Sequence, residues 1–212
     1  MPILNTFRDE ARSRGLLAAD ESVTIDAAYR LVRDMAFGRP SDNRPETVVA
    51  EWRGLSDTKH HLLAQVLEEL GYEVATIVAT HQFAQESEPW LPPHLLEEVK
   101  RQPVRNVMTF LRVRTDPVGD EWTTIDATWP YGAKYLGAPA NEDFKMGVDQ
   151  RTSGVPEEIV HVQDDENPMA AAAKVMAGFA GAEIARTMQF LDEVAAFMAF
   201  ALTPVEGDTD GW

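Results

Sequence analysis

The spacing of apolar residues predicts helices in the first third of the chain. The strongest helical pattern covers residues 54–71, GLSDTKHHLLAQVLEELG, with Ser56 or Asp57 as the cap and Gly71 at the end. Its apolar stripe consists of Leu62, Leu63, Val66, Leu67 and Leu70. Such a stripe is the buried face of a helix, so we expect this helix to pack against another layer. Shorter helices are predicted over residues 5–15, 23–37 (capped by Ser22) and 47–53.

Three runs rich in β-branched residues predict strands in the middle of the chain. They cover residues 72–80, 106–114 and 121–128, and a turn at 116–120 joins the last two. The insertion 84–104 predicts a short helix near residues 93–100. Residues 168–202 predict one or two helices, broken near Gly178 and Gly181. This order predicts an α+β fold in which the long helix packs on an antiparallel sheet.

Composition narrows the function classes. The chain has no cysteine, which excludes disulfides, thiolate metal sites and thiol nucleophiles. It has 19 Lys and Arg against 35 Asp and Glu, a net charge of −16, which argues against binding to nucleic acid or to anionic membranes. No secretory signal and no apolar run of membrane-spanning length is found, so we expect a soluble, cytoplasmic protein.

The segment from Ala27 to Thr128 resembles the transglutaminase-like branch of the papain-like cysteine protease fold. The resemblance rests on order and spacing: AAYRLVRDMAF, then WRGLSDTKHHLLAQVLEELGYEVATIV, NVMTFLRV and EWTTIDATWP. It implies a core over residues 23–130, between an N-terminal arm (1–22) and an irregular segment (131–167). C-terminal helices (168–204) packed on the core and a tail (205–212) follow.

The resemblance also implies where the catalytic residues would fall. The family cysteine falls on Ser56, the histidine on Asn106 or Met108, and the aspartate on Asp126. A helix start favours a thiolate, but it does not ionise a serine, which needs a nearby general base. Neither Asn106 nor Met108 can be that base. The inherited thiol chemistry is therefore lost.

Several of these residues have a structural interpretation as well. Ser56 is a favoured helix cap. Asp126, at a strand end, can form an Asx turn. His81 closes the strand that returns to the site, so it is a candidate for a relocated base, although an exposed loop histidine is the commoner outcome.

The remaining candidates are ligand contacts. His60 can share a helix face with Ser56, and a structural role suits it better than catalysis. Lys59 lies in the first helical turn, where its charge opposes the helix dipole and hints at function. Met108 and Trp129 complete the candidate binding set. His161 with Asp164, Asp165 and Glu166 is a weak metal candidate, and a solvated acidic loop is the simpler interpretation.

Two functions are compatible with these residues. The first is a non-thiol protein that binds a peptide, acyl or small-molecule ligand in the retained cleft, or that serves as a partner subunit or homodimer. The alternative is an enzyme that makes or breaks an amide or ester, with Ser56 as nucleophile, His81 as base and Asp126 as orienting acid. A metal-using enzyme is a weaker alternative. No cofactor is expected, because phosphate-loop and zinc-helix motifs are absent.

Overall fold

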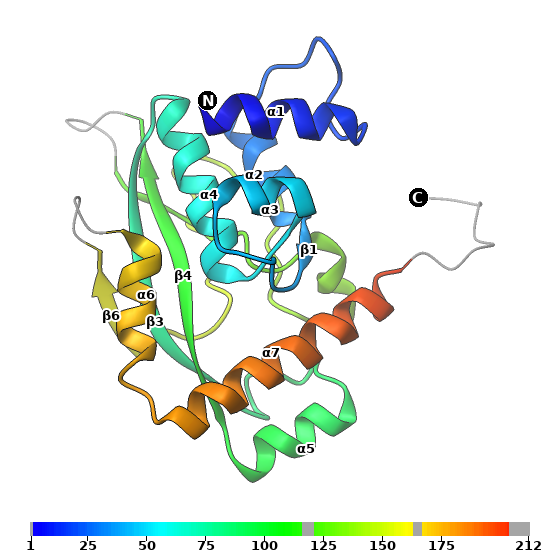
Figure 1. Ribbon diagram of the computed structural model, residues 1–212, viewed down its shortest axis with the longest axis vertical. Coiled ribbons are helices and arrows are strands. Elements are labelled where there is room, and N and C mark those ends of the chain that lie inside the picture. Colours follow the sequence, from blue (N-terminus) through cyan, green and yellow to red (C-terminus); the bar gives the residue numbers. More distant parts are fainter. Residues whose placement is uncertain (1, 116–120, 163–166, 204–212) are drawn as a thin grey trace.

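A computed structural model describes residues 2–115, 121–162 and 167–203, and it confirms a mixed α+β fold. Figure 1 shows α1 to α4 gathered beside one half of the long strands β3 and β4, with α7 crossing near their other half. The predicted turn at 116–120 and the tail at 205–212 lie outside the described residues. Every helix within the described ranges is too short or too polar to cross a membrane.

The N-terminal half contains the helices that the apolar spacing predicts. They are α1 (Ile3–Ser13), α2 (Ile25–Arg33), α3 (Pro45–Glu51) and α4 (Ser56–Glu69). The cap of α2 is Thr24 rather than Ser22, because the Thr24 hydroxyl accepts a hydrogen bond from Ala27 N–H at 3.2 Å. Residues that follow α2 and α3 form a short parallel pair, β1 (Ala36–Phe37) and β2 (Arg53–Gly54), which the sequence did not predict.

The main sheet has the order β5-β4-β3-β6 and is antiparallel throughout. Its strands are β3 (Glu73–Phe83), β4 (Val104–Arg114), β5 (Thr123–Ile125) and β6 (Glu158–His161). The three predicted strands are present, although β5 is shorter than expected. The register of β3 and β4 places His81 opposite Asn106. This pairing brings one end of each long strand to the start of α4.

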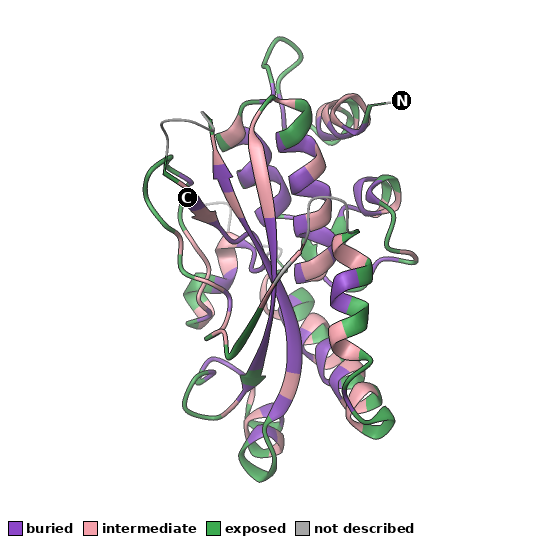
Figure 2. Cartoon of the chain, turned by 90° about the vertical axis from the view of Figure 1, so that its left-hand side faces the viewer, coloured by how far each residue is buried: buried purple, intermediate pink, exposed green. Residues whose placement is uncertain are grey.

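The long helix α4 packs on β3 and β4, as its leucine stripe predicts. Its buried leucines share a core with α1, α2 and α3, while the strand residues Val78 and Val107 pack against α6 (Pro168–Met176). Figure 2 shows that most of β3 and β4 is buried between these layers and the segments around them. The sheet is therefore an interior scaffold, and polar side chains on it are enclosed by the protein.

The C-terminal helices are separated at residues 177–180, in agreement with the glycine signals. The second, α7 (Gly181–Ala201), contacts β1 and β4, and the Thr187 hydroxyl donates to Arg105 O at 2.6 Å. The remaining elements are α5 (Pro93–Arg101) and the 3₁₀ turn η1 (Tyr131–Leu136). Together, α6 and α7 reach the end of the sheet at which α4 begins.

Candidate functional site

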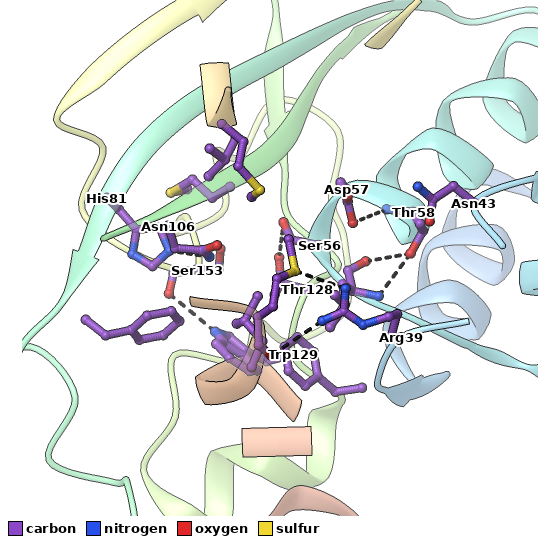
Figure 3. A pocket seen from close by; sticks show the side chains of 18 of the residues that line it. Arg39, Asn43, Ser56, Asp57, Thr58, His81, Asn106, Thr128, Trp129 and Ser153 are labelled. Carbon is purple, nitrogen blue, oxygen red and sulfur yellow. Dashed lines mark hydrogen bonds between the residues drawn. The ribbon is translucent and has the colours of Figure 1, made fainter. Parts of the chain in front are cut away.

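A cavity of about 120 Å³ lies at the start of α4, beside the ends of β3 and β4. In Figure 3, Ser56 and Thr128 lie near its centre, His81 and Asn106 on one side, and Arg39 and Asp57 on the other. Apolar side chains complete its walls: Phe37, Leu55, Phe83, Val107, Met108, Trp129, Met176, Met188 and Leu191. The cavity is small and partly open, and its walls combine apolar side chains with several polar groups, as in many ligand sites.

Ser56 is not the helix cap that the sequence suggests. Leu55 occupies the cap position of α4, and its N–H donates to the Thr58 hydroxyl at 2.9 Å. The Ser56 hydroxyl donates to Thr109 O at 2.9 Å and accepts from Thr109 N–H at 3.1 Å. It also accepts from the Thr128 hydroxyl at 3.1 Å. A hydroxyl has one proton and two lone pairs, so its hydrogen-bonding capacity is fully used.

These contacts explain why β5 is short. The last pair of the β4–β5 ladder joins Leu111 and Ile125, and the same register would place Thr109 opposite Ala127 two residues further on. The Ser56 hydroxyl instead satisfies both backbone groups of Thr109, and Ala127 N–H donates to His60 Nε2 at 2.8 Å. Side chains from the start of α4 therefore replace the backbone hydrogen bonds that would continue between β4 and the residues after β5.

His60 does not line the cavity, so its place in the binding set is wrong; it is a fully buried residue, and the structural role that suited it better than catalysis fits its contacts. Because its Nε2 accepts from Ala127 N–H, the proton lies on Nδ1, which donates to Ser56 O at 2.6 Å. Burial lowers the pKa of this imidazole, and the carboxylate of Asp126, 3.8 Å from Nε2, opposes that shift. Both ring nitrogens have backbone partners, so neither one faces the Ser56 hydroxyl.

Asp126 forms the Asx turn that its position at a strand end suggests. Its carboxylate accepts from Thr128 N–H at 2.9 Å and from Ser153 N–H at 2.6 Å, and the residue is 3% exposed. Thr128 connects it to Ser56, since the same residue donates its hydroxyl there. Ser56 and Asp126 therefore lie at the same end of the sheet, joined through one threonine.

Lys59 is fully buried beneath the site and does not line the cavity. Its ammonium donates to Arg33 O at 2.9 Å and to Thr128 O at 3.1 Å. Burial lowers the pKa of Lys59 to about 7, although the nearby carboxylates of Asp34 and Asp126 favour the charged form. The lysine connects the end of α2 to the segment after β5. This contact accounts for a cation in the first turn of α4.

His81 and Asn106 form a buried pair across β3 and β4. The Asn106 amide nitrogen lies 3.0 Å from His81 Nε2, and the two residues are 6% and 2% exposed respectively. The exposed loop position expected for His81 is therefore wrong, because β3 extends to Phe83. Burial lowers the pKa of His81 to about 4, so the ring is neutral near pH 7. Within the described part of the chain, His81 Nδ1 and Asn106 Oδ1 have no hydrogen-bond partner.

Met108 and Trp129 line the cavity, as proposed for the binding set. Met108 is 1% exposed on β4, and Trp129 packs against Phe37 and Trp90. Trp129 Nε1 donates to Ser153 O at 3.3 Å, which holds the indole against the segment that carries Ser153. Both residues therefore form walls of the cavity.

Sequence reasoning missed several residues of the site. Thr128 and Ser153 line the cavity through contacts with Ser56 and Asp126, and Ser153 lies in the segment without periodicity. Arg39 lines the far side, where Asp192 of α7 holds its guanidinium at 3.1 Å. Only Thr128 carries a local signal, two residues after the strand-ending Asp126.

No family model matches the sequence, and no curated protein matches it. Within the described residues, no group of three or more His, Asp or Glu side chains could hold a metal ion. Asp164, Asp165 and Glu166, which the metal alternative requires, lie outside those residues.

Proposed function

We propose that this chain is a transglutaminase-like protein that has lost thiol chemistry and uses the retained cavity to bind a small ligand. The family resemblance stays part of the proposal. It is supported by the chain order of α4, β3, β4 and β5 and by the common location of Ser56 and Asp126.

The observation that carries the proposal is the bonding of Ser56. A nucleophilic serine needs a free lone pair and a base that takes its proton. Here the proton is donated to Thr109 O, and both lone pairs accept hydrogen bonds, from Thr109 N–H and the Thr128 hydroxyl. The hydroxyl therefore has a structural role at the edge of the cavity.

The enzyme alternative has one supporting observation, since Ser56 and His81 line the same cavity. The hydrogen bonds of His81 and Asp126 favour a binding site instead. His81 is paired with Asn106, while Asp126 is bonded to the backbone of Thr128 and Ser153. Among the described residues, no hydrogen bond joins Ser56 to His81 or His81 to Asp126.

The size of the cavity favours a small molecule over a long peptide. About 120 Å³ is close to the roughly 150 Å³ of an apolar protein cavity that takes up benzene. Met176, Met188 and Leu191 from the C-terminal helices form part of its wall. A partner subunit or homodimer role would use other surfaces and is compatible with this site.

Hydrolysis of 4-nitrophenyl acetate tests the loss of chemistry. We expect no turnover above buffer for the wild type and for Ser56→Cys, because neither Asn106 nor Met108 can act as a general base, and His60 and His81 are bonded to other partners. We expect turnover from Ser56→Cys combined with Asn106→His or with Met108→His. The new thiolate can attack the acetyl carbon and release 4-nitrophenolate, and water activated by the new imidazole can then hydrolyse the thioester, which releases acetate and regenerates the thiol.

The same assay can also contradict the binding proposal. Wild-type turnover that is lost in both Ser56→Ala and His81→Gln would favour the enzyme alternative over the binding proposal. Turnover that survives Ser56→Ala and disappears on addition of a chelator would favour a metal enzyme. Circular dichroism of each variant confirms that the fold is intact before rates are compared.

A further inference from the structure

We infer that Asn106 recognises the ligand, and that this ligand is a neutral molecule about the size of one aromatic ring that donates a hydrogen bond. The inference rests on the proposed function, since it names the ligand class of the same cavity. Asn106 would accept the bond through Oδ1. His81 would act as a positioning residue that holds the Asn106 amide in the required orientation.

The first observation is an unpartnered polar group in an enclosed wall. Asn106 is 94% buried and lines the cavity, yet its Oδ1 has no hydrogen-bond partner among the residues that the structure describes. Buried polar atoms are nearly always paired, and an unpaired one costs stability. In Figure 3 the Asn106 amide lies at the cavity edge, on the same side as His81 and Ser153. A ligand that donates to Oδ1 would supply the missing partner.

The second observation concerns the orientation of that amide. The Asn106 amide nitrogen donates to His81 Nε2 at 3.0 Å, which leaves Oδ1 as the free end. A neutral His81 with its proton on Nδ1 accepts this bond, and burial keeps the ring neutral. Gly154 packs so closely over Nδ1 that an added Cβ would lie 2.6 Å from it. The ring is therefore fixed in place, and so is the amide that it orients.

The third observation is the charge of the walls. Of the described residues that line the cavity, Arg39 is the one with a permanent positive charge, and Asp192 holds it at 3.1 Å. An anionic ligand would meet no free cation and would lose its hydration on entry. On the far side, Asp57 already accepts from Thr58 N–H at 2.8 Å. The end of the cavity near Asn106 suits a neutral group.

The apolar side chains of the cavity wall favour an aromatic ligand. Phe37, Phe83 and Trp129 offer ring faces and edges, and Met108, Met176 and Met188 offer polarizable thioethers. Sulfur and aromatic edges make favourable contacts with an aromatic ring, and methionine adapts to its outline. A single ring fits the cavity volume given above.

Methyl NMR of methionine-labelled protein tests the inference with four probes. Phenol donates a hydrogen bond, anisole only accepts one, toluene does neither, and benzoate is an anion. We expect phenol to shift the methyl signals of Met108, Met176 and Met188 and to leave that of Met35, buried in another core, unchanged. We expect it to bind about tenfold more tightly than anisole or toluene, and benzoate to bind least.

Variants then assign the preference to Asn106. Asn106→Leu should remove the advantage of phenol over toluene. Gln82→Leu, the same chemical change at an exposed position of β3 next to His81, should keep it. His81→Gln should weaken the preference by changing the orientation of the amide. The four-probe comparison on the wild type needs no variant, so it remains decisive if Asn106→Leu unfolds.

Two outcomes would overturn the inference and are distinguishable. Equal binding of phenol, anisole and toluene, or a preference that survives Asn106→Leu, would contradict recognition by Asn106 while leaving ligand binding in the cavity intact. No shift of the three cavity methionines with any probe would contradict both this inference and the proposed function.

Discussion

The hydrogen bonds of Ser56 explain why a serine suits this position in a protein without thiol chemistry. The hydroxyl donates one hydrogen bond and accepts two, and all three partners are buried groups of Thr109 and Thr128. A cysteine sulfur is a weak donor and a weak acceptor and would satisfy them poorly. The serine thus stabilises the contact between α4, β4 and the segment after β5.

Ser56→Ala should lower the free energy of unfolding by about 2–4 kcal/mol, because it leaves three buried groups without a partner. Urea denaturation measures this change. Ser13→Ala is the matched control, since the Ser13 hydroxyl is exposed and bonds to Glu10 O, and its effect should be below about 0.5 kcal/mol. Equal effects of the two substitutions would contradict the structural role of Ser56.

The buried His81 should make stability depend on pH. Its pKa is about 4 in the folded chain and about 6.5 when exposed. Between these values the unfolded chain binds more protons, so stability is fully present above pH 6.5 and is lost as pH falls towards 4. From pH 7 to pH 5, the wild type should lose about 2 kcal/mol more than His81→Gln. Parallel pH profiles for the two proteins would contradict a neutral, desolvated His81.

At the scale of elements, the start of α4 is the junction that positions the site. Side chains from its first two turns bond to the end of α2, to β4 and to residues 126–128, through Ser56, Lys59 and His60. The sequence pattern predicted the helix from its leucines, but not these contacts, because the partners come from segments far away in the chain.

The segment that leads into α4 requires a glycine at position 54, because the space for a Cβ is already occupied there. A Cβ there would lie 2.8 Å from Lys59 Cγ and 2.9 Å from Thr58 Oγ1, both buried. Gly54→Ala should therefore cost about 1–3 kcal/mol in thermal or urea unfolding. Gly181→Ala, at the open start of α7, would place its Cβ more than 4 Å from every described neighbour and should be neutral or slightly stabilising. A mild effect at Gly54 would indicate that Lys59 is free to move.

Considering the whole molecule, the sequence predicted those parts of the fold that have their own periodicity. The α+β class, the packing of α4 on an antiparallel sheet and the break between α6 and α7 are confirmed. The strand β6 was missed, because four residues within a Gly- and Pro-containing segment carry no alternation and gain their structure by pairing with β3.

The candidate site could be predicted from the sequence only in part. Topology placed His81, Asn106 and Ser56 at one end of the sheet, and the cavity contains all three. The expected capping role of Ser56 was wrong, because a local preference yielded to bonds with β4. Closure of the cavity by Met176, Met188 and Leu191 depends on how α6 and α7 dock, which their apolar stripe alone does not specify.

The most direct test of the central claim is intact-mass analysis after incubation with an alkyl fluorophosphonate, which labels activated serines. Because every hydrogen-bonding position of the Ser56 hydroxyl is occupied, we predict no increase in mass for the folded protein. A stoichiometric adduct that peptide mapping places on Ser56, and that His81→Gln abolishes, would show an activated nucleophile and contradict a cavity that binds without catalysis.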